Sequence, residues 1–103
     1  MEHDMANIFK VLSDKNRLEI IELLLKGETC GCTLIEKLPI SQPTLSYHLK
    51  LLTESGLAYT KREGNKTNHY INKDTFDDVI QFLTNLKNTQ LDACHIINEE
   101  ESQ

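Results

Sequence analysis

The sequence has almost no proline, with two in 103 residues, and no long apolar run. No segment approaches the roughly 20 apolar residues that span a membrane, so we expect no membrane partner. The N-terminus, Met-Glu-His-Asp, lacks the basic and then apolar pattern of a secretory signal, which predicts a cytoplasmic protein. A hydrophobic fraction of 39% suits a single domain over residues 1–103 with a modest core, which pairing of two copies would stabilise.

Sequence features of enzymes are also missing. We find no glycine-rich phosphate loop, no nucleophile next to a base and no pair of carboxylates, and so short a chain has little room for a substrate pocket. We therefore predict that the protein is not an enzyme and binds no organic cofactor.

Cysteine is scarce as well, and the three cysteines are Cys30, Cys32 and Cys94. This number is too small for a disulfide framework, and in a reducing compartment a close cysteine pair more often supplies thiolate ligands or a redox group. The alternative is that Cys30 and Cys32 are two small buried hydrophobic residues at the start of a helix.

Charge is distributed unevenly along the chain. The net charge of −5 argues against nonspecific binding to nucleic acid, which depends on Lys and Arg. Residues 42–73, however, have five basic and two acidic side chains, whereas residues 1–41 have a balance of −2 and residues 74–103 of −6. A cationic central segment suits a localised DNA-binding surface, although chance clustering on a solvated face explains it equally well.

Hydrophobic spacing predicts four helices in the first half of the chain. The first covers residues 4–12. The second begins at an N-cap, Ser13, buries Leu18, Ile21, Leu24 and Leu25, and ends at Gly27. Cys30 and Cys32 lie at the entrance of a third helix that ends before Pro39, and a fourth begins at Ser41 and ends at Gly56.

The second half predicts a β-hairpin within residues 57–71, with a turn at residues 63–66, followed by a last helix from Asp74. The apolar stripe of this last helix extends to Leu91, beyond what one small domain covers, so we expect it to meet its copy in a homodimer. The acidic tail, about residues 98–103, is expected to fray. The order α-α-α-α-β-β-α is that of a mainly α winged helix-turn-helix.

The fourth helix and the hairpin contain the candidate DNA-binding residues. With the leucines turned inward, the helical period leaves polar side chains outward that can contact base edges or phosphates. Cations flank the hairpin turn, where they can bind phosphates or enter the minor groove. The set is Gln42, Thr44, Ser46, Tyr47, His48, Lys50, Lys61, Arg62 and Lys66. The alternatives are an ordinary solvent-exposed helix face and, for His48, a half-buried packing role, which we favour; Tyr47 is similarly ambiguous.

Four segments resemble the arsenical-resistance repressor (ArsR/SmtB) family. They are Leu12-Ser13-Asp14, Arg17-Leu18-Glu19-Ile20, the run from Glu28 to Leu34 and the run from Ser41 to Lys50, within a match from about Ile8 to Ile71. The chain is most similar to the trivalent arsenic and antimony sensors, except that Thr29 replaces a leucine and Lys15 a proline. The resemblance implies a homodimer that binds palindromic double-stranded operator DNA and releases it when the toxic ion binds.

Thiolates select soft ions, so Cys30 and Cys32 are predicted to bind As(III) or Sb(III) as inducer, with cadmium or lead as alternatives. Residues two apart on an ideal helix point about 200° away from each other. We therefore expect that the pair can hold one ion only if the entrance of the third helix unwinds, which Gly31 makes easier. A third ligand is Cys94, an exogenous thiol or none, since Ile35 stands where some arsenic sensors have a third cysteine.

Other regulatory functions stay open. The same fold can respond to Cd, Pb or Zn, but a site on the last helix is poorly supported because His95 and Glu99 lack an Asp-x-His partner near Asp77. The cysteine pair can instead sense oxidants, although direct closure of a disulfide across one residue is expected to be strained. A winged helix that binds only protein is a third possibility.

Overall fold

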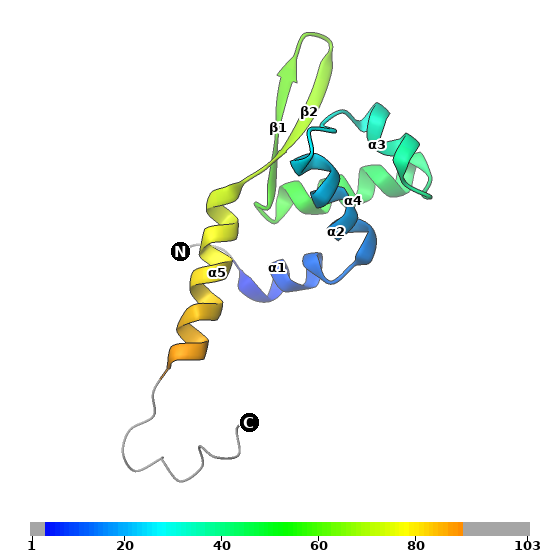
Figure 1. Cartoon of the computed structure of the whole chain (residues 1–103). Coiled ribbons are helices and arrows are strands. Elements are labelled where there is room, and N and C mark those ends of the chain that lie inside the picture. The colour runs from blue at the N-terminus through cyan, green and yellow to red at the C-terminus, as the bar shows by residue number, and fades with distance from the viewer. Residues whose placement is uncertain (1–3, 90–103) are drawn as a thin grey trace, which may run out of the picture.

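The computed structural model describes residues 4–89. Its elements are α1 (Met5–Leu12), α2 (Lys15–Leu25), α3 (Gly31–Lys37), α4 (Gln42–Glu54), β1 (Ala58–Glu63), β2 (Lys66–Ile71) and α5 (Lys73–Asn88). The hairpin projects beyond the cluster of helices α2 to α4, and α5 leads away from it (Figure 1). This order confirms the winged helix-turn-helix architecture predicted from the sequence.

Side-chain caps begin the helices. Ser41 caps α4 as predicted, because its hydroxyl accepts a hydrogen bond from the Thr44 backbone N–H. The predicted cap at Ser13 is wrong: Asp14 is extended, and its carboxylate accepts from the N–H groups of Asn16 and Arg17 at 2.8 and 3.1 Å. Ser13 instead ends α1, where its hydroxyl donates to the Lys10 carbonyl.

The core lies between α1, α2, α3 and α4 and continues to the hairpin and α5. Its buried hydrophobic side chains are Ile8, Val11, Ile20, Ile21, Leu24, Leu34, Leu38, Leu45, Leu49, Leu52, Leu57, Ala58 and Val79. On α2 the apolar stripe predicted from the sequence is partly wrong, because it included Leu18 and Leu25. Leu18 and Leu25 are 46% and 55% exposed, because Ile20, Ile21 and Leu24 take the inward arc and leave positions 18 and 25 at its edge.

The hairpin is antiparallel, with Tyr59 opposite Tyr70, and the rings of these two residues stack with centroids 5.6 Å apart. Gly64 makes its tight turn with φ of 66°, a backbone angle that side chains with a Cβ disfavour. A short third segment lies at the free edge of β2: Cys30 pairs with Asn68, and the His69 N–H donates to the Thr29 carbonyl at 2.9 Å. The segment that contains the thiol pair thus extends the sheet of the wing.

Helix α5 begins in the core and then leaves it. Near its start the Thr75 hydroxyl donates to the Gly56 carbonyl at 2.7 Å, and Val79 is buried. Further along, Ile80, Leu83 and Leu86 are 59%, 48% and 59% exposed, which confirms that the apolar stripe exceeds what this domain covers. Leu91 and the acidic tail lie outside the described residues. None of the helices described is long and apolar enough to span a bilayer.

Candidate DNA-binding surface and thiol site

The outer face of α4 is polar and exposed. Its inner face is fixed by Leu45, Leu49 and Leu52, all in the core. The side chains that remain outward are Gln42, Thr44, Ser46, Tyr47 and Lys50, as the helical period predicted. Ser41 donates to the Thr44 hydroxyl at 3.0 Å, which fixes the orientation of the first turn of this face. A rigid helix with a polar outer face is what the major groove of DNA accommodates.

His48 does not belong to that face. It is only 5% exposed, and its Nδ1 accepts a hydrogen bond from the Arg17 guanidinium on α2 at 3.0 Å. This burial supports the packing role that the sequence analysis favours for His48, and its inclusion among the DNA-binding residues stays a prediction. Arg17 also donates through Nε to the Val11 carbonyl at 2.7 Å, so one side chain links α1, α2 and α4.

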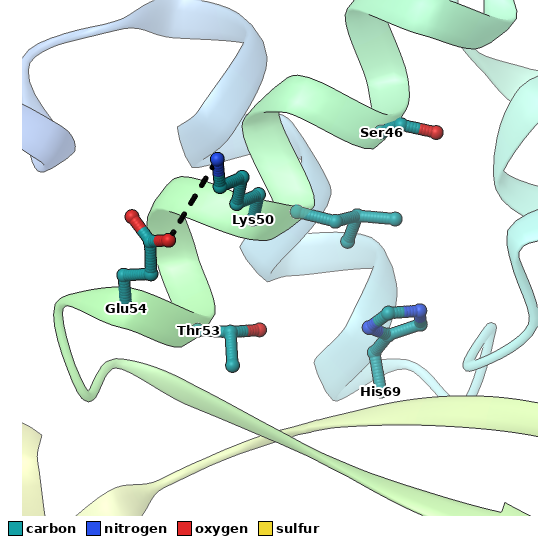
Figure 2. A pocket seen from close by; sticks show the side chains of 6 residues that line it. Ser46, Lys50, Thr53, Glu54 and His69 are labelled. Carbon is teal, nitrogen blue, oxygen red and sulfur yellow. Dashed lines mark ion pairs between the residues drawn. The ribbon is translucent and has the colours of Figure 1, made fainter.

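A groove of about 420 Å³ lies between α4 and His69 of β2. Figure 2 shows Ser46, Lys50, Thr53 and Glu54 along α4 and His69 opposite them. Lys50 pairs with Glu54 at 3.9 Å on its outer side. Burial lowers the pKa of His69, and the Nδ1 of this ring has no hydrogen-bond partner within residues 4–89. His69 is therefore a neutral wall of the groove near neutral pH.

The wing presents its cations to solvent. Lys61, Arg62 and Lys66 are all exposed on either side of the turn. The Lys61 ammonium lies 5.4 Å from the centroid of the Tyr70 ring, and the Arg62 Nε donates to the Gly64 carbonyl at 3.4 Å. These contacts keep the cationic groups at the projecting end of the hairpin, where they suit phosphate contacts.

The acidic residue among these cations is held in place by two hydrogen bonds. Glu63 Oε1 accepts from the Tyr70 hydroxyl at 2.7 Å and from the Asn68 amide at 2.5 Å. The hydrogen bond from Tyr70, followed by that from Asn68, lowers the pKa of Glu63, while the same contact with Glu63 raises the pKa of Tyr70. Glu63 is consequently an anchored carboxylate within the wing.

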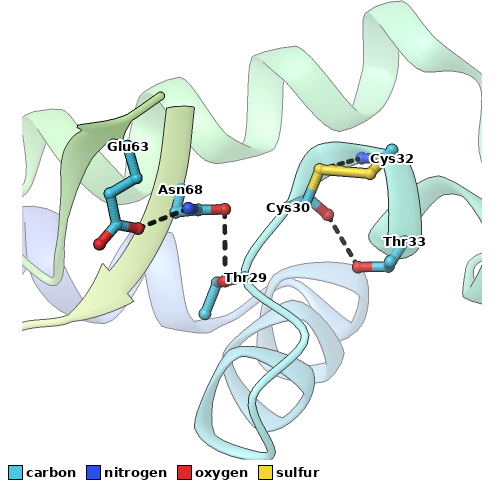
Figure 3. The surroundings of a disulfide bond; sticks show 6 residues. All are labelled: Thr29, Cys30, Cys32, Thr33, Glu63 and Asn68. Carbon is cyan, nitrogen blue, oxygen red and sulfur yellow. Dashed lines mark hydrogen bonds between the residues drawn. A yellow bond between two sulfur atoms is a disulfide. The ribbon is translucent and has the colours of Figure 1, made fainter. Parts of the chain in front are cut away.

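The thiol pair lies at the start of α3. Cys30 is the N-cap of this helix, in an extended conformation with φ −92° and ψ 137°, and its sulfur accepts from the Cys32 N–H at 3.2 Å. The two residues are joined as a disulfide (Figure 3) with Cα atoms 5.2 Å apart, within the usual disulfide range of about 4.4–6.8 Å. Backbone position therefore does not prevent a direct bond.

This geometry corrects the expectation that α3 must unwind. The angle of 200° applies to two helical residues, but only Cys32 is helical, and α3 is regular from Gly31 onward. Both sulfurs already point to one place. Cys32 is exposed and Cys30 is half-buried, so reagents in solution reach the pair.

No third ligand is close to the pair among the described residues, since residues 4–89 contain no cluster of three or more His, Cys, Asp or Glu side chains fit for a metal ion. Cys94, His95, Glu99 and His3 lie outside this range, so the third ligand remains a prediction. The two sulfurs themselves fit a soft ion by donor type and proximity.

Sequence reasoning missed several residues around these sites. Arg17 bonds to His48 and Thr29 to Asn68, which connects segments far apart in the chain, and Glu63 bonds to Asn68 across the hairpin. One signal for Asn68 was available. Asparagine is a poor strand former, so an asparagine in the middle of β2 indicates that its side chain makes a hydrogen bond. The long-range partners themselves have no signature in local spacing.

A helix-turn-helix with an exposed polar second helix, a cationic wing and an accessible pair of sulfurs defines a DNA-binding transcriptional regulator, not an enzyme. The sequence model described as "Bacterial regulatory protein, arsR family" matches residues 14–60. An arsenical resistance operon repressor of Staphylococcus aureus is 45% identical over 91 residues, which are 88% of this chain and 86% of the relative. The chain belongs to the ArsR family of transcriptional repressors.

Solved structures share the fold. An ArsR-like transcriptional regulator from Rhodococcus sp. RHA1 superposes with a TM-score of 0.73 at 25% identity, covering 81% of this chain and 78% of that one. A possible ArsR-family regulator from Mycobacterium bovis, described as a homodimeric winged helix-turn-helix DNA-binding domain, has a TM-score of 0.64 at 24% identity and coverages of 85% and 82%.

Proposed function

We propose that this protein is a cytoplasmic, homodimeric repressor that binds a palindromic operator and releases it when As(III) or Sb(III) binds Cys30 and Cys32. The observation that carries this proposal is the meeting of two accessible sulfurs at the N-terminus of α3, which leads directly into α4. The name of the S. aureus relative, a repressor of an arsenical resistance operon, supports the choice of ion.

Operator binding is assigned to two surfaces. The exposed face of α4 enters the major groove, with Gln42, Thr44 and Ser46 nearest the base edges because they lie at the N-terminal end of the helix. Lys61, Arg62 and Lys66 contact phosphates of flanking DNA from the wing, so they contribute affinity more than sequence preference.

Two copies pair through the stripe that α5 leaves uncovered. Ile80, Leu83 and Leu86 form an apolar surface that continues from buried Val79, and such a surface favours burial against its own copy. Phe9 of α1 contacts Phe82 at 5.9 Å, which places α1 beside this surface. In this proposal the whole chain is one domain, with its terminal helices in the dimer interface.

Sedimentation tests the dimer. The variant Leu83→Asp is expected to sediment as a monomer and to bind the operator more weakly, because a carboxylate would be buried in the interface. The matched control is Asn85→Asp, at an exposed position on the opposite side of the helix. Equal dimer fractions for the two variants would place the interface elsewhere.

Induction is tested by fluorescence anisotropy of labelled operator DNA, titrated with arsenite under reducing conditions. For the wild type we expect arsenite to weaken operator binding by about 5- to 150-fold, the range of an ordinary allosteric coupling. Cys30→Ser and Cys32→Ser should keep operator binding and lose the response, whereas Cys94→Ser measures the third ligand. If both single-serine variants release the operator at the same arsenite concentration as the wild type, Cys30 and Cys32 are not the arsenite site.

The disulfide in the structure favours a second candidate, a redox-responsive regulator of the same fold. Here peroxide oxidises the two thiols to the disulfide and is itself reduced to water. Titration with hydrogen peroxide in place of arsenite distinguishes the two: release by peroxide and not by arsenite supports the redox function, and the opposite result supports the ion sensor.

A further inference from the structure

The two cysteines are attached to different parts of the fold. Cys32 lies in the first turn of α3, which Leu34 and Leu38 hold in the core. Cys30 lies outside the helix, opposite Asn68 at the edge of β2. The link between the two sulfurs therefore joins α3 to the sheet of the wing.

Side chains continue this connection across the hairpin. The Thr29 hydroxyl donates to Asn68 Oδ1 at 3.4 Å, and Asn68 Nδ2 donates to Glu63 on β1. Glu63 also accepts from Tyr70, whose ring lies beside the Lys61 ammonium. Figure 3 shows the first part of this path, in which Asn68 points from β2 toward Thr29 and bonds to Glu63 on its other side.

We propose that Asn68 is a positioning residue that couples the thiol pair to the wing, so that a change of state at Cys30 and Cys32 moves the cationic hairpin relative to α4. This inference rests on the proposed function and names the residues through which the thiol pair would affect DNA binding. The wing and α4 must contact DNA at the same time, and a shift between them separates the phosphate contacts from the base contacts.

The groove between the two units makes such a shift feasible. About 420 Å³ of open space separates α4 from His69, so β2 is not packed tightly against the recognition helix there. On its other side β2 is held to the thiol segment by the His69 N–H to Thr29 carbonyl hydrogen bond and by the Asn68 side chain. Strand β2 is thus hydrogen-bonded to the thiol segment, whereas the hairpin packs against α4 through β1.

The first test measures the wing without DNA. Backbone ¹H–¹⁵N shifts of residues 61–66 are recorded for the dithiol form, the disulfide form and the dithiol form with arsenite. We expect wild-type shifts to change between these states and the changes to be at least halved in Asn68→Ala. Unaltered wing shifts in the wild type, or equal changes in wild type and variant, would overturn the proposal.

The second test measures the response of operator binding to arsenite. Mutations along a coupling route typically change it by about 2- to 30-fold, so Asn68→Ala should reduce the arsenite-induced loss of operator affinity by that factor. Its arsenite affinity, measured without DNA, should stay within about twofold of wild type. A purely structural role would weaken DNA binding equally with and without arsenite.

Thr29 provides a matched pair of variants. Thr29→Val removes the hydroxyl that bonds Asn68 and should reduce the response, whereas Thr29→Ser keeps it and should restore the response. Thr67→Ala, at an exposed position next to Asn68, is the control for changes in the strand itself. If wild-type protein keeps its operator at every arsenite concentration, the proposed inducer is wrong, while the shift experiment still decides whether Asn68 couples thiols to wing.

Discussion

Replacing Arg17 with methionine should destabilise the protein by about 2–4 kcal/mol. Two buried acceptors depend on this guanidinium: the carbonyl of Val11, a residue 3% exposed, and Nδ1 of His48, a residue 5% exposed. Each buried acceptor left unpaired costs about 1–3 kcal/mol. Because Arg17 itself is half-buried, water recovers part of the loss, and methionine retains much of the packing of the arginine stem.

Urea unfolding followed by far-UV circular dichroism measures this effect, at one protein concentration for all variants because a dimer's stability depends on it. Lys15→Met is the control, since it removes an exposed cation from the same helix and should change the free energy of unfolding by less than about 0.5 kcal/mol. A double-mutant cycle with His48→Phe should give a coupling energy of about 1 kcal/mol or more.

Two results would refute the reasoning. If Arg17→Met and Lys15→Met unfold at the same urea concentration, the guanidinium does not support the core. If the cycle gives no coupling, Arg17 acts without His48. In the expected case operator affinity also falls, because the link from α2 fixes the position of α4.

Three further predictions concern the cap, the wing and pH. Ser41→Ala should cost about 1 kcal/mol in the free energy of unfolding, because the Thr44 N–H loses its acceptor; no change in urea midpoint would contradict the cap. Lys66→Gln should lower the slope of log affinity against log salt by about 0.9 on both operator and random DNA, whereas loss on the operator alone would indicate a base contact. Burial lowers the pKa of His69 below 6.5, so stability is full above pH 6.5 and declines as the pH falls toward the lower folded value. His69→Gln should reduce the difference in unfolding free energy between pH 7.5 and 5.5, and an unchanged difference would assign it to other groups.

The order of helices and strands was predictable from the sequence because it depends on local pattern. Apolar spacing, the Ser41 cap and the glycine at the hairpin turn act within a few residues of themselves. Errors arose where two local signals competed. Ser13 and Asp14 both cap helices well, and only the folded backbone shows that Asp14 takes the extended conformation.

The candidate site was predictable in its residues but not in its geometry. Cys30 and Cys32 follow from residue type and spacing, but the sequence does not show that Cys30 is the extended N-cap of α3 and pairs with Asn68, 38 residues further along the chain. A helical wheel treats both cysteines as helical and contains no long-range contact. For this reason it predicted that the two sulfurs point in different directions. His48 was ambiguous for the same reason, since its partner Arg17 lies on another helix.

The pairing of Thr29 and Cys30 with β2 also protects a strand edge. A two-stranded ribbon has unpaired amide and carbonyl groups along both sides, and such edges recruit strands from other molecules. Here the segment of Thr29 and Cys30 shields part of one side. Chimeras that exchange this segment between relatives to alter ion preference should therefore exchange β2 with it, or they will expose a template for aggregation.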